Sequence, residues 1–243
     1  MSKPKKIYIF KSVILQKIYS INLKIITMKR LLTILSLICF SGNILSNDYR
    51  LITLSGKDGL SQQDVECILQ DKQGFIWIGT YDGLNRYDGN SFLLFRHNPQ
   101  NTNSISDNRI LSLQEWPERD ELWIGTDGGG LNCYNLKTEC ITRYMADSKH
   151  KGQLTDNQIS CFDKNGDEMW VGTTNGPHKI TFTTDNKIHI EHYSLKGNSE
   201  ENILQYTVSI GHDDNGNIIA ATPKGLFLKN KSESDFKLVK KMS

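Results

Sequence analysis

A motif of about a dozen residues recurs four times at nearly constant spacing, and this repeat constrains the fold more than any other feature. The copies are FIWIGTYDGLNRYDG from Phe75, LWIGTDGGGLNCY from Leu122, MWVGTTNGPHKI from Met169 and IIAATPKGLFL from Ile218. Their anchor positions are 46, 47 and 49 residues apart and hold Trp77, Trp123, Trp170 and Ile219. A period in the high forties is typical of β-propeller blades.

Each copy predicts four short antiparallel strands. An apolar-polar run begins 11 to 13 residues before each anchor, and another follows it: SFLLFRH, CITRYM, KIHIEHY and DFKLVK. Turn residues such as Asp-Gly separate the runs. The pattern predicts an all-β fold, a partial, open β-propeller of about four four-stranded antiparallel blades. We place a closing strand at 49–60 and the blades at 61–105, 106–154, 155–203 and 204–243.

The anchors predict how neighbouring sheets pack. A large aromatic residue in each blade fills the gap between two sheets, and a small residue two positions later allows their close approach. The pairs are Trp77 with Gly79, Trp123 with Gly125, and Trp170 with Gly172. The fourth copy holds Ile219 and Ala221 and is degenerate. We interpret these residues as structural and assign none of them to a ligand.

The first 46 residues differ from the rest of the chain. They hold eight basic residues and no acidic one, and MKRLLTILSLICFSG begins at Met28. The apolar segment Leu31–Phe40 has the length of a signal-peptide core and is short for a bilayer span. We therefore predict a leader at 1–46, with Met28 as the true start and cleavage after Ser46. Its helix should be separate from the blades at 47–243.

Removing the leader reverses the net charge. Basic residues fall from 29 to 21 while the 27 acidic residues remain, so the exported chain carries about −6 instead of +2. No basic stripe remains for nucleic acid or an anionic membrane surface. No further apolar run is long enough for a membrane helix. The prediction is an exported, periplasmic chain that binds no nucleic acid and does not insert into a membrane after cleavage.

The cysteines and histidines predict neither a metal site nor a cofactor, because none has zinc-ligand spacing. Cys67 and Cys161 hold equivalent positions in two blades that a third separates, which is too far for a disulfide. Cys133 and Cys140 flank the turn YNLKTE, and we expect them to be cross-strand neighbours. The sequence leaves open whether a disulfide joins them, although free thiols are favoured.

GLSQQDVECILQDKQGFIWIGTYDGLNRYDG followed by LWIGTDGGGLNCY resembles the two-component-regulator propeller repeat. The resemblance extends from Tyr49 to about Lys241 and weakens toward the fourth copy. It implies the periplasmic sensor of a Bacteroides-type hybrid two-component histidine kinase. In that family two propellers and an immunoglobulin-like domain precede a membrane helix, a kinase, a receiver and a DNA-binding domain. Glycans or their breakdown products are the implied signals.

The resemblance also implies that much of such a protein is missing here. The remaining blades and a dimer partner would be the partners of this chain in the full-length family. YRLITLS from Tyr49 looks like a strand that closes the ring in its last blade, yet the fourth copy already owns an outer strand. We therefore expect a fragment without the kinase and DNA-binding parts.

Candidate ligand-binding residues lie in loops and at the ends of inner strands. They are Tyr81, Asp82, Arg86, Asn108, Asp127 and Asn157. An alternative is a secreted lyase or glycosidase that uses two carboxylates, for example Asp64, Asp107 or Asp156. A third is a protein-binding propeller scaffold. Because Ser/Thr-Asp-Asn recurs before two strands, a turn-forming role is favoured for these groups. We predict no catalytic residue and no enzyme.

Overall fold

The computed structural model describes residues 51–146, 153–195 and 205–241. The chain divides into two compact units, Met1–Ile52 and Thr53–Ser243, and the second unit contains every strand that the structure describes. The first two sheets are formed by β1 (Val65–Gln70), β2 (Ile76–Thr80), β3 (Gly83–Tyr87), β4 (Phe92–Phe95), β5 (Ile110–Trp116), β6 (Glu121–Thr126), β7 (Leu131–Asn135) and β8 (Ile141–Tyr144). The other two are formed by β9 (Ile159–Asn165), β10 (Glu168–Thr173), β11 (Gly176–Phe182), β12 (Ile188–His192), β13 (Ser209–His212), β14 (Ile218–Thr222), β15 (Gly225–Lys229) and β16 (Lys237–Lys241).

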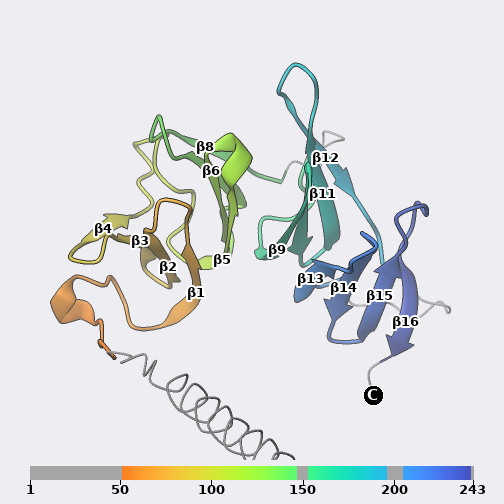
Figure 1. Cartoon of the computed structure of the whole chain (residues 1–243), viewed down its shortest axis with the longest axis horizontal. Helices are drawn as coiled ribbons and strands as arrows, with labels where there is room; N and C mark the ends of the chain where they lie inside the picture. Colours follow the sequence, from red (N-terminus) through yellow and green to blue (C-terminus); the bar gives the residue numbers. More distant parts are fainter. Residues whose placement is uncertain (1–50, 147–152, 196–204, 242–243) are drawn as a thin grey trace, which may run out of the picture. The chain divides into compact units, whose positions relative to one another are not determined.

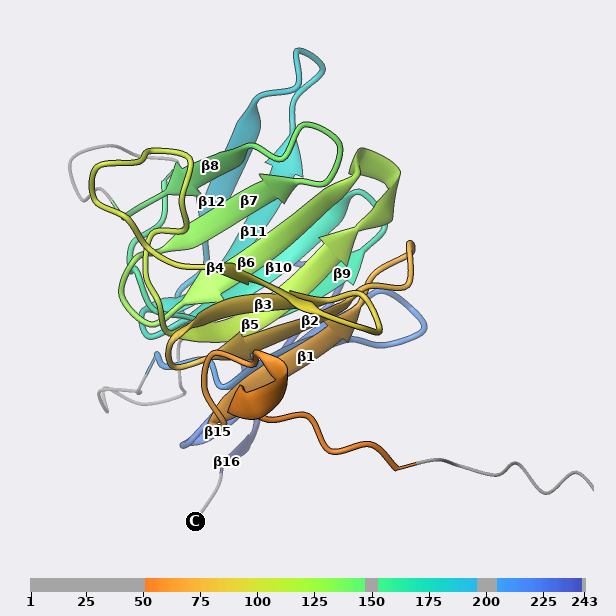
Figure 2. The same ribbon diagram turned by 90° about the vertical axis from the view of Figure 1, so that its left-hand side faces the viewer.

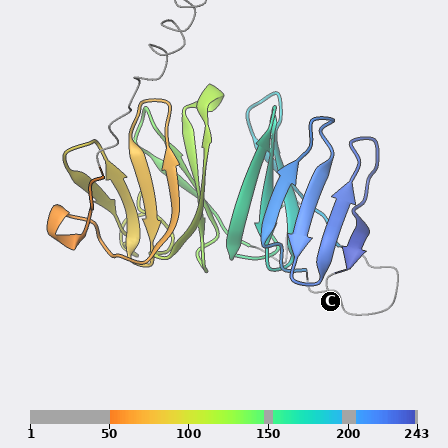
Figure 3. The same ribbon diagram turned by 60° about the horizontal axis from the view of Figure 1, so that its bottom comes forward.

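Every sheet is an antiparallel meander of four strands in sequence order, and Figures 1 and 3 show the four sheets. Their first strands are neighbours in succession, because β1 contacts β5, β5 contacts β9, and β9 contacts β13. We refer to these four as the inner strands. The predicted all-β fold of consecutive propeller blades is confirmed.

The anchor tryptophans pack between successive sheets as predicted. Trp77, Trp123 and Trp170 lie at the same position of β2, β6 and β10, and each is at most 1% exposed. The residue two positions after each of these tryptophans is a glycine, because the inner strand of the next blade approaches closely there. A Cβ added at Gly79 would lie 2.7 Å from a methyl group of Ile110 in the next blade. This glycine therefore lets the next inner strand reach the sheet.

The fourth anchor differs because the face on which it lies has no neighbouring sheet in the described chain. Ile219 is 39% exposed, and Val239 of β16 is also exposed. In the first sheet, β1 exposes Ile68. Figure 2 views the chain from the side of that sheet. The first and the last described sheet thus each present apolar side chains to solvent.

The expectation that Cys133 and Cys140 are cross-strand neighbours is wrong. Cys133 lies opposite Thr142 in the β7–β8 ladder, whereas Cys140 precedes β8 in an exposed turn. The turn is longer than a tight hairpin because Glu139 adopts a left-handed φ of 57°. Asn135 N–H donates to the carbonyl of Cys140 and closes the turn there. Both cysteines are free thiols.

The stretch 49–60 is not one continuous strand. Residues 51–55 form no strand, and a 3-10 turn, η1 (Gly56–Asp58), follows with Ser55 as its N-cap. A second such turn, η2 (Pro117–Arg119), joins β5 to β6. The predicted leader at 1–46, with its helical segment Leu31–Phe40, lies outside the described residues. Among the residues that are described, no helix has the length and hydropathy needed to cross a membrane.

Candidate functional site

A buried threonine fixes the β2–β3, β6–β7 and β10–β11 turns in the same way. The hydroxyl of Thr80 donates to the carbonyl of Gly83 over 2.9 Å, and Thr126 and Thr173 repeat this bond with Gly130 and Gly176. Each of these glycines has a positive φ, between 80° and 110°. The residue after the threonine is therefore held at one end of the inner strands, next to the segment that leads into the following blade.

A second repeated clamp fixes the segment that enters each blade. The side-chain amide of Asn132 in β7 bonds Ser106 twice: its oxygen accepts from the backbone N–H over 3.0 Å, and its nitrogen donates to the hydroxyl over 2.8 Å. Asn85 makes the same pair of bonds to Ser61 in the first blade. The segments that enter β1 and β5 are thus bonded to buried asparagines of β3 and β7.

In the third blade a histidine takes the place of this asparagine. His178 Nε2 accepts the backbone N–H of Thr155 over 3.2 Å and lies 3.1 Å from its hydroxyl. The ring is fully buried and its centroid lies 4.8 Å from that of His192. Burial, with a smaller effect of His192, lowers the pKa of His178 to about 3. The imidazole is therefore neutral at ordinary pH and substitutes structurally for asparagine.

On this framework five polar side chains form one chain across three blades, which we call the rim cluster: Glu66, Tyr81, Arg109, Asp127 and Gln158. Arg109 donates to an oxygen of Asp127 over 2.7 Å and to the hydroxyl of Tyr81 over 3.2 Å. Its guanidinium lies 4.2 Å from the centre of the Tyr81 ring and 3.5 Å from a carboxylate oxygen of Glu66. The amide of Gln158 donates to the other oxygen of Asp127.

The rim cluster is accessible to solvent. The side chain of Arg109 is 42% exposed, and Tyr81 is one of the exposed large apolar residues of the chain. A hydrogen bond to Glu66 raises the pKa of the Tyr81 hydroxyl, so this group is a donor at neutral pH. The cluster thus offers one aromatic ring, two carboxylates, one guanidinium and one amide. Such a set can recognise hydroxyl-rich ligands by hydrogen bonding and ring contact.

Two of the six predicted ligand-binding residues, Tyr81 and Asp127, belong to the rim cluster. Asp82 instead forms an ion pair with Arg96, which follows β4. A guanidinium nitrogen of Arg96 lies 2.5 Å from a carboxylate oxygen of Asp82. Arg86 lies on β3 opposite Trp77 and stacks over the ring of Phe75 at 4.7 Å. The structure therefore does not bring Asp82 or Arg86 to the rim cluster.

Asn108 and Asn157 bond the backbone of the preceding blade. The side-chain oxygen of Asn108 accepts from His97 N–H, and its carbonyl accepts from Gly83 N–H, both over 2.7 Å. Asn157 makes equivalent bonds to Ala146 and Gly130. These side chains hold the outer strand of one blade against the entry of the next.

The aspartates beside them are also engaged locally. Asp107 and Asp156 each accept from the backbone N–H two residues later, at Arg109 and Gln158. This is the side-chain-to-backbone bonding of an Asx turn. Asp64 is exposed and accepts from the amide of Gln62. Each of the three carboxylates is thus bonded to a residue two positions away in the sequence.

Glu66, Arg109 and Gln158 were missed by the sequence interpretation, although a signal for two of them exists. Arg109 and Gln158 directly precede the first residue of an inner strand, where the first blade has Asp64. In the second and third blades a Ser/Thr-Asp-Asn group precedes this position and an isoleucine follows it, whereas the position itself varies. A variable polar residue in a constant frame is the pattern expected of a ligand-facing position. Within the ranges that the structure describes, no group of three or more metal-ligating side chains occurs.

Comparison with known proteins finds two local sequence matches. Residues 59–82 match the family described as Two component regulator propeller. Over 49 residues, 20% of the chain, the sequence is 55% identical to Histidine kinase P4 of Formosa agariphila. That match spans 4% of the kinase's length.

Solved structures show the same architecture. The extracellular domain of a protein described as a hybrid two component system from B. thetaiotaomicron is 25% identical, with a TM-score of 0.68 over 78% of this chain. The chain spans 26% of that structure. Virginiamycin B lyase from Staphylococcus aureus has a TM-score of 0.51 at 15% identity over 76% of this chain, and it shares the fold alone.

Proposed function

We propose that this chain is the ligand-sensing propeller of a two-component signalling protein and that it recognises glycans or oligosaccharides outside the cytoplasm. The propeller match at residues 59–82 and the similarity to the B. thetaiotaomicron extracellular domain support the sensor role. The predicted leader supports the periplasmic location. In the full-length protein, further blades, a dimer partner and a kinase act with it.

The rim cluster is the observation that carries the proposed ligand class. Saccharides present hydroxyl groups that both donate and accept, and they present apolar ring faces. Arg109 and Gln158 supply donors, Asp127 and Glu66 supply acceptors, and the ring of Tyr81 supplies an apolar surface. Because three successive blades contribute, an oligosaccharide can contact several of them at once.

We propose further that the chain binds its ligand without cleaving it, in contrast to the lyase and glycosidase alternatives. Glycoside cleavage needs one carboxyl group that is protonated and a second that attacks or activates water. At the rim, Asp127 is held by Arg109 and Gln158, and Glu66 is held by Arg109 and Tyr81. Both carboxylates thus already accept hydrogen bonds or pair with donors inside the rim cluster, which suits a binding surface better than a general acid.

Calorimetric titration of the purified chain with a panel of neutral and acidic oligosaccharides tests the proposal. Replacing Arg109 by alanine removes a charge-assisted contact, so we expect affinity to fall about tenfold or more. Arg96→Ala is the matched control, because Arg96 is similarly exposed, pairs with Asp82 and lies outside the rim cluster. Equal losses in the two variants would remove the rim cluster as the site. Release of sugar products during the titration would support an enzyme instead.

A further inference from the structure

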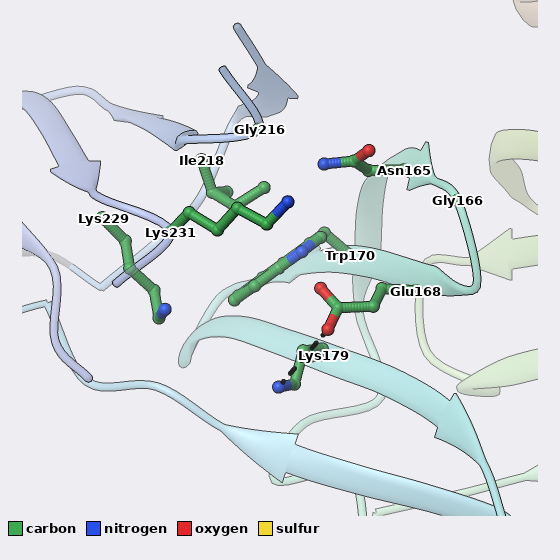
Figure 4. Close-up of a pocket in the computed structure, with 9 residues that line it drawn as sticks. All are labelled: Asn165, Gly166, Glu168, Trp170, Lys179, Gly216, Ile218, Lys229 and Lys231. Carbon is green, nitrogen blue, oxygen red and sulfur yellow. Dashed lines mark ion pairs between the residues drawn. The ribbon is translucent and has the colours of Figure 1, made fainter. Parts of the chain in front are cut away.

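A cavity of about 430 Å³ lies between the third and fourth blades, away from the rim cluster. Its lining includes Trp170 and Glu168 of β10, Lys179 of β11, and Lys229 and Lys231 at the end of β15 and just after it. In Figure 4 the indole of Trp170 lies between Lys231 and Glu168. The volume is within the range of small-molecule sites.

The repeat shows that this cavity replaces an apolar contact. Counting from the glycine that opens the third strand of each blade, the positions of Lys229 and Lys231 hold Ile180 and Phe182 in the third blade. Ile180 is fully buried, and Phe182 packs edge-on against Trp116 at 5.3 Å. Two apolar positions at the preceding junction thus become lysines at this one.

The partner of that aromatic contact changes as well. Trp116 ends β5, and the residue that ends β9 at the same repeat position is Asn165, which lines the cavity. A tryptophan and a phenylalanine that fill one junction are therefore replaced by an asparagine and a lysine at the next. Their smaller and polar side chains leave the cavity open.

The lysines carry positive charge that the surrounding carboxylates offset only in part. Lys229 is 9% exposed, and its ammonium donates to the backbone carbonyl of Glu233 over 2.6 Å. Lys179 pairs with Glu191 at 3.2 Å and with Glu168 at 3.8 Å. Lys231 also lines a neighbouring hollow with Asp213 and Asp214, but among the residues described it forms no ion pair with either. The buried Lys229 is bonded to a backbone carbonyl and forms no ion pair with a described carboxylate, and the exposed Lys231 adds a second positive charge, so this lining favours an anionic occupant.

The anchor tryptophan supplies an unused donor at the same place. Trp77 donates its indole N–H to Asp71, and Trp123 donates to Glu121 over 3.1 Å. In the third blade, Glu168 holds the position of Glu121 but pairs with Lys179. Trp170 Nε1 is buried without a hydrogen-bond partner in the described chain. A buried N–H without an acceptor is costly, so a bound acceptor would be stabilised there.

We propose that this inter-blade cavity binds a small polar molecule that carries an oxyanion, a carboxylate or a sulfate. Lys231 and Lys229 contact the anion, and the indole N–H of Trp170 provides an uncharged donor. An acidic monosaccharide and a free inorganic anion share this chemistry and differ in the rest of the occupant. The site is separate from the rim cluster, so it goes beyond the proposed function and does not depend on it.

Heteronuclear NMR of the indole N–H groups, combined with calorimetry, tests the site with three probes: sodium glucuronate, glucose and sodium sulfate. We expect glucuronate to bind and to shift the Trp170 resonance, identified by its loss in Trp170→Phe, while the other three indole signals stay in place. Glucose should cause no shift. If sulfate shifts the same signal as strongly as glucuronate, the oxyanion site stands and its occupant is an inorganic anion.

Variants at the cavity separate this site from the rim. Lys231→Phe restores the aromatic residue of the preceding blade and should lower glucuronate affinity about tenfold or more, as should the milder Lys231→Gln. Lys224→Gln is the matched control, since Lys224 lies in the β14–β15 turn at the opposite end of these strands. Arg109→Ala should leave this binding unchanged. Absence of any Trp170 shift with all three probes, or equal losses in the Lys231 and Lys224 variants, would overturn the inference.

Discussion

Replacing Trp123 by alanine should be among the most destabilising single changes in the chain. The side chain is fully buried, stacks on Tyr144 at 5.8 Å, packs edge-on against Phe182 at 6.3 Å and donates to Glu121. A tryptophan buries about 150–250 Å², which corresponds to about 4–6 kcal/mol of transfer free energy. Because the sheets can close only part of the cavity, we expect a loss of about 3–5 kcal/mol in the free energy of unfolding.

The matched control is Ile219→Ala, at the same repeat position of the fourth blade. Ile219 is 39% exposed and faces no described sheet, so its removal should cost about 1 kcal/mol or less. Urea unfolding followed by far-UV circular dichroism measures both, since fluorescence would be altered by the loss of a tryptophan. Equal destabilisation in the two variants, or a loss below about 1 kcal/mol for Trp123→Ala, would refute the claim that inter-blade packing makes this position important.

Two further predictions concern pH and association. His178 has a pKa lowered to about 3 in the folded chain against an ordinary value of 6.5, so the unfolded chain binds the proton first and stability falls as pH drops below 6.5. Between pH 6.5 and 5 this costs about 2 kcal/mol, and His178→Asn, which copies the first two blades, should remove most of that dependence in urea titrations; an unchanged slope would contradict it. We also expect purified Asn47–Ser243 to self-associate through its exposed end sheets, and Ile219→Lys with Val239→Lys to reduce this in sedimentation velocity. A clean monomer that melts cooperatively above about 60 °C would contradict this prediction.

The blade architecture was predictable from the sequence because it depends on local and repeated signals. Alternating apolar residues set the strands, glycines with positive φ set the turns, and the 46-to-49-residue period set the number of sheets. The buried roles of Trp77, Trp123 and Trp170 followed from the same repeat and are confirmed. The expected cross-strand register of Cys133 and Cys140 was wrong, since the turn with the left-handed Glu139 is longer and places Thr142 opposite Cys133.

The candidate sites were predictable only in part, because each is assembled from side chains that lie far apart in the sequence. Tyr81 and Asp127 were predicted individually, yet the guanidinium that joins them comes from Arg109 at the start of a different strand. Asn108 looked like a ligand-facing residue and instead bonds the backbone of the preceding blade. Whether a polar loop residue points to solvent or to a neighbouring chain segment depends on how two blades meet.

The sequence by itself determined the blades, their order and the anchor residues that pack between them, since each copy of the repeat encodes the same backbone geometry. Only the tertiary structure decided which side chains meet across a junction. At the junction of the second and third blades, Trp116 and Phe182 fill the space. At the next junction, Asn165 and Lys231 leave it open. The physical reason is that packing depends on the pairing of two surfaces, and each surface is encoded in a separate copy of the repeat.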